Sequence, residues 1–263
     1  MRVTVRDLSR FKSEGKRFTV LTAYDYLTAS ILDEAGIPVL LVGDSLSQVV
    51  LGYENTLPVT MEQMLHHTAA VVRGARTAMV VADMPFGSYQ GSTSEGLNNA
   101  VRFLKEAGAA AVKMEGARLE LTQTLVDHGI PVMAHLGLTP QSVHSLGGYR
   151  VQARTQESAD RLQSDALSME KAGAFALVLE AIPADVATAI SRSLTIPTVG
   201  IGAGPGCDAQ VMVITDLLGM GAGTAPRFVK AYANLRETIT EAVQTFKGDV
   251  EAGAYPDASH SYT

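Results

Sequence analysis

Little in this sequence points to a secreted, membrane-bound or nucleic-acid-binding protein. Cys207 is the one cysteine among 263 residues, so no internal disulfide can form, which agrees with a reducing compartment. The 21 basic residues are outnumbered by 27 acidic residues and form no basic block, which argues against nucleic acid as a partner. The longest apolar runs, such as residues 37–43, are far shorter than the roughly 18 residues that cross a bilayer. The first residues, MRVTVRD, contain no apolar signal region, so we expect a soluble cytoplasmic protein without a membrane partner.

The chain also lacks a linker-like segment, so residues 1–263 are expected to form one domain. The length matches the roughly 250 residues of a single barrel of eight strand–helix units. Short runs of Val, Leu, Ile and Ala alternate with helical patterns, and four helices end at a glycine just before the next strand, in EAGIPV, EAGAAAV, DHGIPV and KAGAFAL. Because such alternation implies a parallel sheet, the predicted fold class is α/β, a single (β/α)8 TIM barrel.

The candidate strands are eight short apolar runs. They cover residues 19–24, 39–43, 78–82, 110–114, 131–135, 175–179, 198–201 and 211–215. Between the last two strands, GAGPGCDAQ is too short for a full helix, so either that helix is reduced or one strand is misassigned. Helices are predicted at residues 26–35 and 60–73, and another is predicted to begin near Ser94.

The two ends of the chain are predicted to differ. Residues 1–15 hold a short amphipathic helix over residues 4–12, with Thr4 as its cap, which could close the bottom of the barrel. A final helix is predicted at residues 228–246, and residues 248–263 form a polar, mobile tail.

Charged side chains follow several of the strands. They are Asp25, Asp44, Asp83, Lys113, Glu115 and Glu180. Ligands of parallel barrels bind at this end of the strands, although any single acid there could simply cap the next helix. Asp44, Asp83 and Glu115 follow three neighbouring strands, so their carboxylates can converge, where they repel one another unless a cation is present. Because oxygen ligands suit Mg²⁺, the sequence predicts a magnesium site at the barrel mouth.

Several other features of the mouth allow more than one interpretation. Lys113 and Glu115 both point into the barrel, where they form either a buried salt bridge or, through the lysine, a contact to a substrate carboxylate or enolate oxygen. Glu180 follows an apolar strand and is a candidate general base. The glycine-rich segment 200–206 is either a phosphate grip or a tight loop that needs small residues. The long segment 137–155 is a lid, a wall for a co-substrate, or a subunit contact.

Long motifs across nearly the whole chain resemble the ketopantoate hydroxymethyltransferase family. They are LTAYDY (21–26), VGDSLSQVVLGYENTLPVT (42–60), ADMPFGSYQ (82–90), AVKMEG (111–116), AHLGLTPQSVHSLGGYRVQ (134–152), LVLEAIP (177–183) and TVGIGAGPGCDAQVMVITDLLG (198–219). The resemblance implies a barrel of the phosphoenolpyruvate mutase/isocitrate lyase group. It also implies formation of ketopantoate from α-ketoisovalerate and 5,10-methylenetetrahydrofolate, through a Mg-stabilised enolate, in pantothenate biosynthesis.

The resemblance further implies a role for each matching residue. Asp44 and Asp83 match direct Mg²⁺ ligands, and Glu115 matches an acidic residue associated with the metal. The substrate-binding set comprises Asp44, Ser45, Asp83, Lys113 and His135. Glu180 matches the proton acceptor. The family forms decamers, so a homo-oligomer is expected.

Two other functions remain open at this point. A Mg-dependent 2-oxo acid lyase or mutase of the same barrel group would use the same metal site without folate. The isocitrate lyase type has a cysteine after the fourth strand, whereas this chain reads MEGARLE at residues 114–120. A non-catalytic barrel that senses a keto acid would need no base, so Glu180 argues mildly against it.

Overall fold

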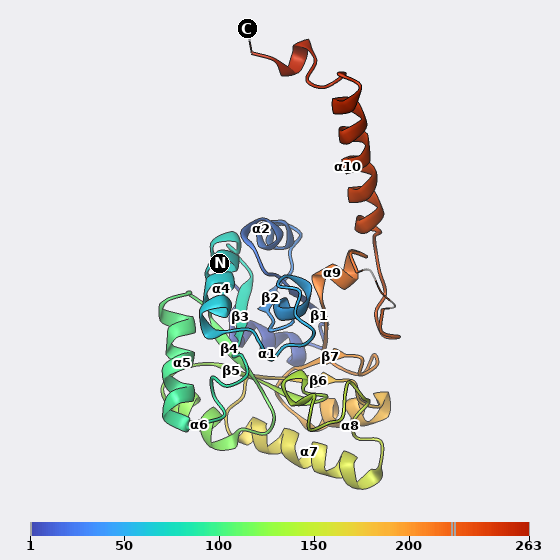
Figure 1. Cartoon of the computed structure of the whole chain (residues 1–263). Helices are drawn as coiled ribbons and strands as arrows, with labels where there is room; N and C mark the ends of the chain where they lie inside the picture. The colour runs from blue at the N-terminus through green and yellow to red at the C-terminus, as the bar shows by residue number, and fades with distance from the viewer. Residues whose placement is uncertain (1, 222, 224, 263) are drawn as a thin grey trace. The chain divides into compact units, whose positions relative to one another are not determined.

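Eight parallel strands close into a barrel in chain order (Figure 1). Strand β1 pairs with both β2 and β8. The strands of this computed structural model are β1 (Phe18–Thr22), β2 (Val39–Val42), β3 (Met79–Asp83), β4 (Ala111–Glu115), β5 (Val132–Gly137), β6 (Ala176–Glu180), β7 (Thr198–Ile201) and β8 (Ala209–Met212). The structure describes residues 2–221, 223 and 225–262. The predicted TIM barrel is confirmed, including its eighth strand, which begins two residues earlier than predicted.

Alternate residues of each strand face opposite sides of the barrel wall, as the two-residue period of a strand requires. In β6, Ala176 and Val178 belong to the buried cluster inside the barrel. Leu177 and Leu179 belong to a second cluster, which contains residues of α7 (Gln156–Lys171) and α8 (Ala184–Ser193). Side chains in phase with the inner set therefore point into the barrel, and those in phase with the outer set hold the helices.

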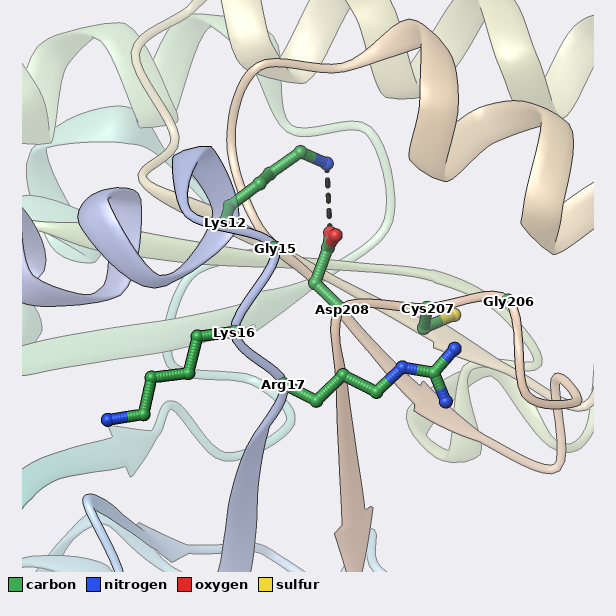
Figure 2. A pocket seen from close by; sticks show the side chains of 7 residues that line it. All are labelled: Lys12, Gly15, Lys16, Arg17, Gly206, Cys207 and Asp208. Atoms are coloured by element: carbon green, nitrogen blue, oxygen red, sulfur yellow. Dashed lines mark hydrogen bonds and ion pairs between the residues drawn. The ribbon is translucent and has the colours of Figure 1, made fainter.

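The amino end of the barrel is closed by α1 (Val5–Ser13), as predicted. Thr4 precedes the helix, and its backbone N–H donates to Asp7 Oδ2 at 2.9 Å. Leu8 is fully buried in the same cluster as Val20 and Met133 inside the barrel. A small pocket of about 110 Å³ lies at this end, between the segment after α1 and the segment before β8 (Figure 2).

The remaining barrel helices are α2 (Tyr26–Glu34), α3 (Leu46–Val49), α4 (Met61–Gly74), α5 (Thr93–Lys105) and α6 (Leu119–Asp127), with α7 and α8. Four of them begin at side chains that accept hydrogen bonds from free backbone N–H groups. Asp25, Thr60, Ser92 and Thr155 cap α2, α4, α5 and α7 in this way. The helices predicted at residues 26–35 and 60–73 and near Ser94 are therefore confirmed.

The connection between β7 and β8, residues 202–208, contains no helix. A Cβ atom added at Gly206 would overlap the Thr188 hydroxyl oxygen on α8, and one at Gly204 would overlap the Cβ of Ala184. The loop therefore needs small residues where it runs against α8. Phosphate binding by this segment stays a prediction.

The chain divides into two compact units, Met1–Val213 and Ile214–Thr263. The second unit contains α9 (Ile214–Leu217), α10 (Leu235–Glu251) and a 3-10 turn (Ala258–His260). The helix predicted at residues 228–246 is displaced, because Tyr232 N–H and Leu235 N–H donate to Leu217 and Leu218 carbonyls instead of continuing a helix. The first residues of the predicted tail, 248–251, belong to α10, and Thr263 lies outside the described residues.

Within the part of the chain that the structure describes, no helix is both long and apolar enough to cross a membrane.

Candidate functional site

The charged residues predicted for the mouth converge inside the carboxyl end of the barrel. Asp83, Lys113 and Glu115 lie in phase with the inward-facing core residues of β3 and β4, and the register pairs Asp83 with Lys113. Glu115 in turn pairs with His135 of β5. Asp44 follows β2 by two residues, and its side chain shares Gln141 with Glu115, which places it in the same group. Each of these five residues is at most 4% exposed.

Asp25, by contrast, takes no part in this site. Its carboxylate accepts hydrogen bonds from the Thr28 N–H at 2.8 Å and the Thr28 hydroxyl at 2.7 Å, so it caps α2 at the surface. The helix-capping alternative is thus correct for Asp25.

A line of polar contacts crosses the site from Asp83 to Glu180. Lys113 Nζ lies 2.7 Å from Asp83 Oδ1 and 3.2 Å from His135 Nδ1. On the other side of the ring, His135 Nε2 lies 3.2 Å from Glu180 Oε2, close but imperfectly aligned for a hydrogen bond. Glu180 ends β6, and its side chain is 16% exposed, more than any other charged side chain on this line.

The protonation states along this line follow from burial and charge. Burial opposes the charge on Lys113, but Asp83, Glu115 and Asp44 outweigh that effect and raise its pKa, so it stays an ammonium. Burial and the Lys113 charge both lower the pKa of His135, so its imidazole is neutral. Because an ammonium can only donate, His135 Nδ1 accepts, and the ring proton lies on Nε2 toward Glu180.

The carboxylates of Asp44 and Glu115 carry unfavourable charge. Burial and the neighbouring Asp83 raise the pKa of Asp44 to about 7. Burial and then Asp44 raise the pKa of Glu115 well above its usual range. Three buried carboxylates therefore face one ammonium, Lys113, and this excess of negative charge favours an added cation.

The donor set fits a magnesium ion in part. Asp83 Oδ1 and Glu115 Oε1 are buried and have no well-aligned hydrogen bond among the described residues. Within the same residues, no three His, Cys, Asp or Glu side chains are already grouped so that they could hold a metal ion. Mg²⁺ commonly binds through one or two carboxylates and keeps several waters, so the arrangement fits that mode better than a complete cage of protein ligands.

Gln141 joins two of the carboxylates and is absent from the predicted site. It lies in a 3-10 turn (Pro140–Ser142) after β5 and is 5% exposed. Its side-chain N–H₂ donates to Asp44 Oδ2 and to the Met84 carbonyl, both at 2.9 Å, and its backbone N–H donates to Glu115 Oε2 at 2.9 Å. Gln141 thus fixes the positions of both carboxylates.

Two tyrosines complete the network. The Tyr89 hydroxyl donates to Gln141 Oε1 at 2.6 Å and accepts from the Glu115 backbone N–H at 3.0 Å. The Tyr24 hydroxyl and Ser45 Oγ lie 2.8 Å apart, which holds the predicted substrate contact Ser45 in place. Uncharged side chains in loops carry no strand-end signal, so the sequence pattern does not single out Tyr24, Tyr89 or Gln141.

The long segment 137–155 is tied to the end of β6. Leu138 N–H donates to the Glu180 carbonyl and Gln152 N–H to the Ala181 carbonyl, each at 2.9 Å. Ala181 has φ +46°, a left-handed conformation that is strained for a residue with a side chain. Burial and then the charges of Asp44 and Glu180 raise the pKa of Tyr149, which places this side chain near the mouth. A role for the segment as lid, folate wall or subunit contact stays a prediction.

Comparisons with known proteins agree on one family. The family model described as ketopantoate hydroxymethyltransferase matches residues 2–258. A relative from Frankia casuarinae is 56% identical over 263 residues, covering 99% of this chain and 88% of the relative. One from Thermobifida fusca is also 56% identical, covering 99% and 94%. Both are named 3-methyl-2-oxobutanoate hydroxymethyltransferase.

Solved structures share the fold at low sequence identity. A 2,3-dimethylmalate lyase, described as a PEP mutase/isocitrate lyase superfamily member, has a TM-score of 0.63 at 15% identity, with 99% of this chain and 89% of that chain covered. A phosphonopyruvate hydrolase in complex with oxalate and Mg²⁺ has a TM-score of 0.61 at 16% identity, with 98% and 93% covered. At this level of identity the likeness shows a shared barrel fold.

Proposed function

Because this chain belongs to the ketopantoate hydroxymethyltransferase family, we propose that the barrel mouth transfers a hydroxymethyl group from 5,10-methylenetetrahydrofolate to 3-methyl-2-oxobutanoate (α-ketoisovalerate). The family and the name of its relatives make the protein a one-carbon transferase of pantothenate formation. The observation that supports this use of the mouth is the group of three buried carboxylates around one ammonium, with Glu180 beside it.

Asp44 and Asp83 would hold Mg²⁺ directly, and Glu115 would stand next to it. Their oxygen atoms suit a hard cation, and Glu115 Oε1 is buried without a hydrogen bond among the described residues. A bound Mg²⁺ supplies a Lewis acid that polarises the 2-oxo group of the keto acid and acidifies its hydrogen on carbon three.

Glu180 removes that hydrogen as general base in this proposal. Its carboxylate is the most exposed on the line of contacts, so a substrate that enters the mouth can reach it. His135 Nε2 lies 3.2 Å from this carboxylate, and a small rotation of either side chain would let its N–H orient the base. Lys113 and Ser45 contact the oxygen atoms of the keto acid, and the ammonium stabilises the negative charge that develops there.

Water adds to the methylene carbon of the folate, and the bonds from this carbon to the two folate nitrogens break as each nitrogen takes one proton of the water. Carbon three then forms a bond to the released carbon, whose oxygen takes the proton held by Glu180 and becomes the hydroxyl of the product, and tetrahydrofolate leaves. Residues 137–155, which carry Gln141 and Tyr149 near the mouth, are the segment most able to exclude bulk water during this step.

The proposal is tested by measuring hydrogen exchange at carbon three of the keto acid in the absence of folate. Proton NMR of 3-methyl-2-oxobutanoate in D₂O should show loss of the carbon-three signal only when both protein and Mg²⁺ are present, before any folate is added. Later addition of 5,10-methylenetetrahydrofolate should convert the same sample to ketopantoate. Absence of exchange with metal, even after tetrahydrofolate is added, would contradict the proposed enolisation.

A lyase or mutase of the same barrel group has weaker support. The solved structures of that group share only the fold with this chain, at 13–18% identity. A homo-oligomer, a decamer by family resemblance, and a cytoplasmic location remain predictions of this proposal.

A further inference from the structure

A pocket of about 400 Å³ lies beside the carboxylate site, between the loops that follow β3 and β4. Its lining includes the ring of Tyr89, the start of α5 with Thr93, and the start of α6 with Arg118, Leu119 and Glu120. This volume falls within the range of about 300–1,000 Å³ that is typical of small-molecule sites. The mechanism above uses none of the residues 118–120.

Tyr89 forms a wall common to this pocket and the carboxylate site. Its ring lines the pocket, while its hydroxyl contacts Gln141 and the Glu115 backbone N–H. Arg118 follows Glu115 by three residues, so their backbones are at most about 11 Å apart. A ligand in the pocket would therefore lie next to the group that holds the keto acid.

The walls of the pocket suit a flat aromatic ring. The Arg118 guanidinium carbon lies 5.9 Å from the centre of the Tyr89 ring, and this side chain has no hydrogen bond or ion pair among the described residues. Leu119 is 42% exposed at the same place. A planar cation, an aromatic ring and an apolar side chain together favour stacking with a planar heterocycle.

At the pocket, only one of the two carboxylate oxygens of Glu120 accepts a hydrogen bond from the described residues. Glu120 Oε1 accepts a hydrogen bond from the Thr93 hydroxyl at 3.1 Å, which ties α6 to α5. The structure records no partner for Glu120 Oε2 among the residues that it describes. A carboxylate held in this way matches a ligand edge with two neighbouring N–H donors.

We propose that this pocket binds the pterin ring of the folate co-substrate. The ring stacks between Arg118 and Leu119 near Tyr89, and its amino group and adjacent ring N–H donate to Glu120. The inference rests on the proposed function, which supplies the folate. The acidic glutamyl tail fits this pocket less well, because Glu120 and Glu95, whose carboxylate approaches Gly91, outnumber the single cation Arg118.

A direct measurement of folate binding tests the proposed pterin site independently of catalysis. Calorimetric titration with 5-formyltetrahydrofolate, a stable folate, should show a dissociation constant roughly tenfold to a hundredfold higher for Glu120→Gln than for the unchanged protein, the effect of losing a hydrogen-bonded charge. Arg118→Ala should weaken binding by roughly fivefold to tenfold through lost stacking. Asp127→Asn, which removes a carboxylate at the other end of α6, is the matched control and should bind normally.

The metal-dependent hydrogen exchange of the keto acid, measured without folate, separates this inference from the proposed function. Glu120→Gln and Arg118→Ala should exchange at the unchanged rate, because neither side chain contacts the keto acid site. Unchanged folate affinity in both variants would overturn the pterin site. So would a change in their oligomeric state or loss of exchange, since either indicates a structural role. Exchange by a protein that binds no folate would overturn the pterin site and leave the enolising step intact.

Discussion

The two ends of the barrel differ in how fully their carboxylates are paired with hydrogen-bond donors and cations. At the amino end, Asp208 Oδ2 accepts from Lys12 Nζ at 2.8 Å (Figure 2). It also accepts from the backbone N–H and the hydroxyl of Thr198, at 2.8 and 2.9 Å. At the carboxyl end, Asp44 and Glu115 are buried with raised pKa values and share one ammonium with Asp83. A carboxylate whose lone pairs are filled by the protein stabilises the fold, whereas a buried group of like charges needs a ligand to be stable.

The comparison predicts first that changes at the carboxyl end affect the reaction far more than the stability. Glu180→Gln should lower the metal-dependent exchange of the carbon-three hydrogen by about 10²–10⁴-fold, because it removes the proposed general base. Calorimetry should show that the variant still binds Mg²⁺ and the keto acid. Exchange at the normal rate would remove Glu180 from that role.

A second, smaller effect is expected when the network around the carboxylates is cut. Gln141→Leu removes the amide that donates to Asp44 Oδ2 and accepts from Tyr89. Loss of such an orienting group typically lowers metal affinity by about 10–100-fold. Titration with Mg²⁺ measures the change, and Gln156→Leu on the exposed start of α7 is the control. Equal Mg²⁺ affinity in the two variants would mean that Gln141 serves the fold alone.

Glu180 and Gln141 also show what sequence patterns can and cannot reveal. The acids at strand ends are visible because short strands, charged residues and helix-ending glycines recur in several units, and the alternation of β3 and β4 places Asp83, Lys113 and Glu115 on the inner face. Gln141 is not visible, because an uncharged residue 97 positions from its partner Asp44 has no local signal. The same limit explains Asp25, whose sequence context resembles that of Asp44 although it caps a helix.

The boundaries of elements depend on contacts that a local pattern does not contain. Apolar residues within 228–234 suggest a helix, but long-range backbone bonds such as Tyr232 N–H to the Leu217 carbonyl hold this segment in another form. The eighth strand is readable from its apolar residues. The absence of a helix before it depends on how closely Gly204 and Gly206 approach α8.

At the amino end the comparison predicts loss of stability without loss of chemistry. Asp208→Asn weakens the ion pair with Lys12 and the bonds from Thr198, so the free energy of unfolding should fall by about 1–3 kcal/mol. Urea denaturation measures this fall, and Asp160→Asn on α7 should change it by less than about 0.5 kcal/mol. Hydrogen exchange by folded Asp208→Asn should equal that of the unchanged protein. A large drop in exchange would show that the two ends are coupled.

The smallest predicted effect depends on pH. Asp33 Oδ1 accepts from Thr77 N–H at 2.9 Å and Ala78 N–H at 2.6 Å, just before β3. Burial opposes the charge, but these bonds outweigh it and lower the pKa of Asp33 below its ordinary value of 3.8. The stability that it contributes is therefore full above pH 3.8 and is lost as the pH falls through the lower, folded-state pKa.

Urea denaturation between pH 7 and pH 3 compares the unchanged protein with Asp33→Asn, which cannot titrate. The difference in unfolding free energy should be constant near neutral pH and should shrink toward the acid end. A difference that stays constant to the lowest pH would show that ionisation of Asp33 does not contribute to stability.

Because Leu8 of α1 is buried in the core at the amino end of the barrel, we expect both substrates to enter at the carboxyl end. In the proposed function the keto acid lies deepest, against Lys113 and the carboxylates, and the folate lies nearer to the solvent. Bound folate should therefore block release of the keto acid. Steady-state kinetics should consequently be ordered, with the keto acid the first to enter and its hydroxymethylated product the last to leave.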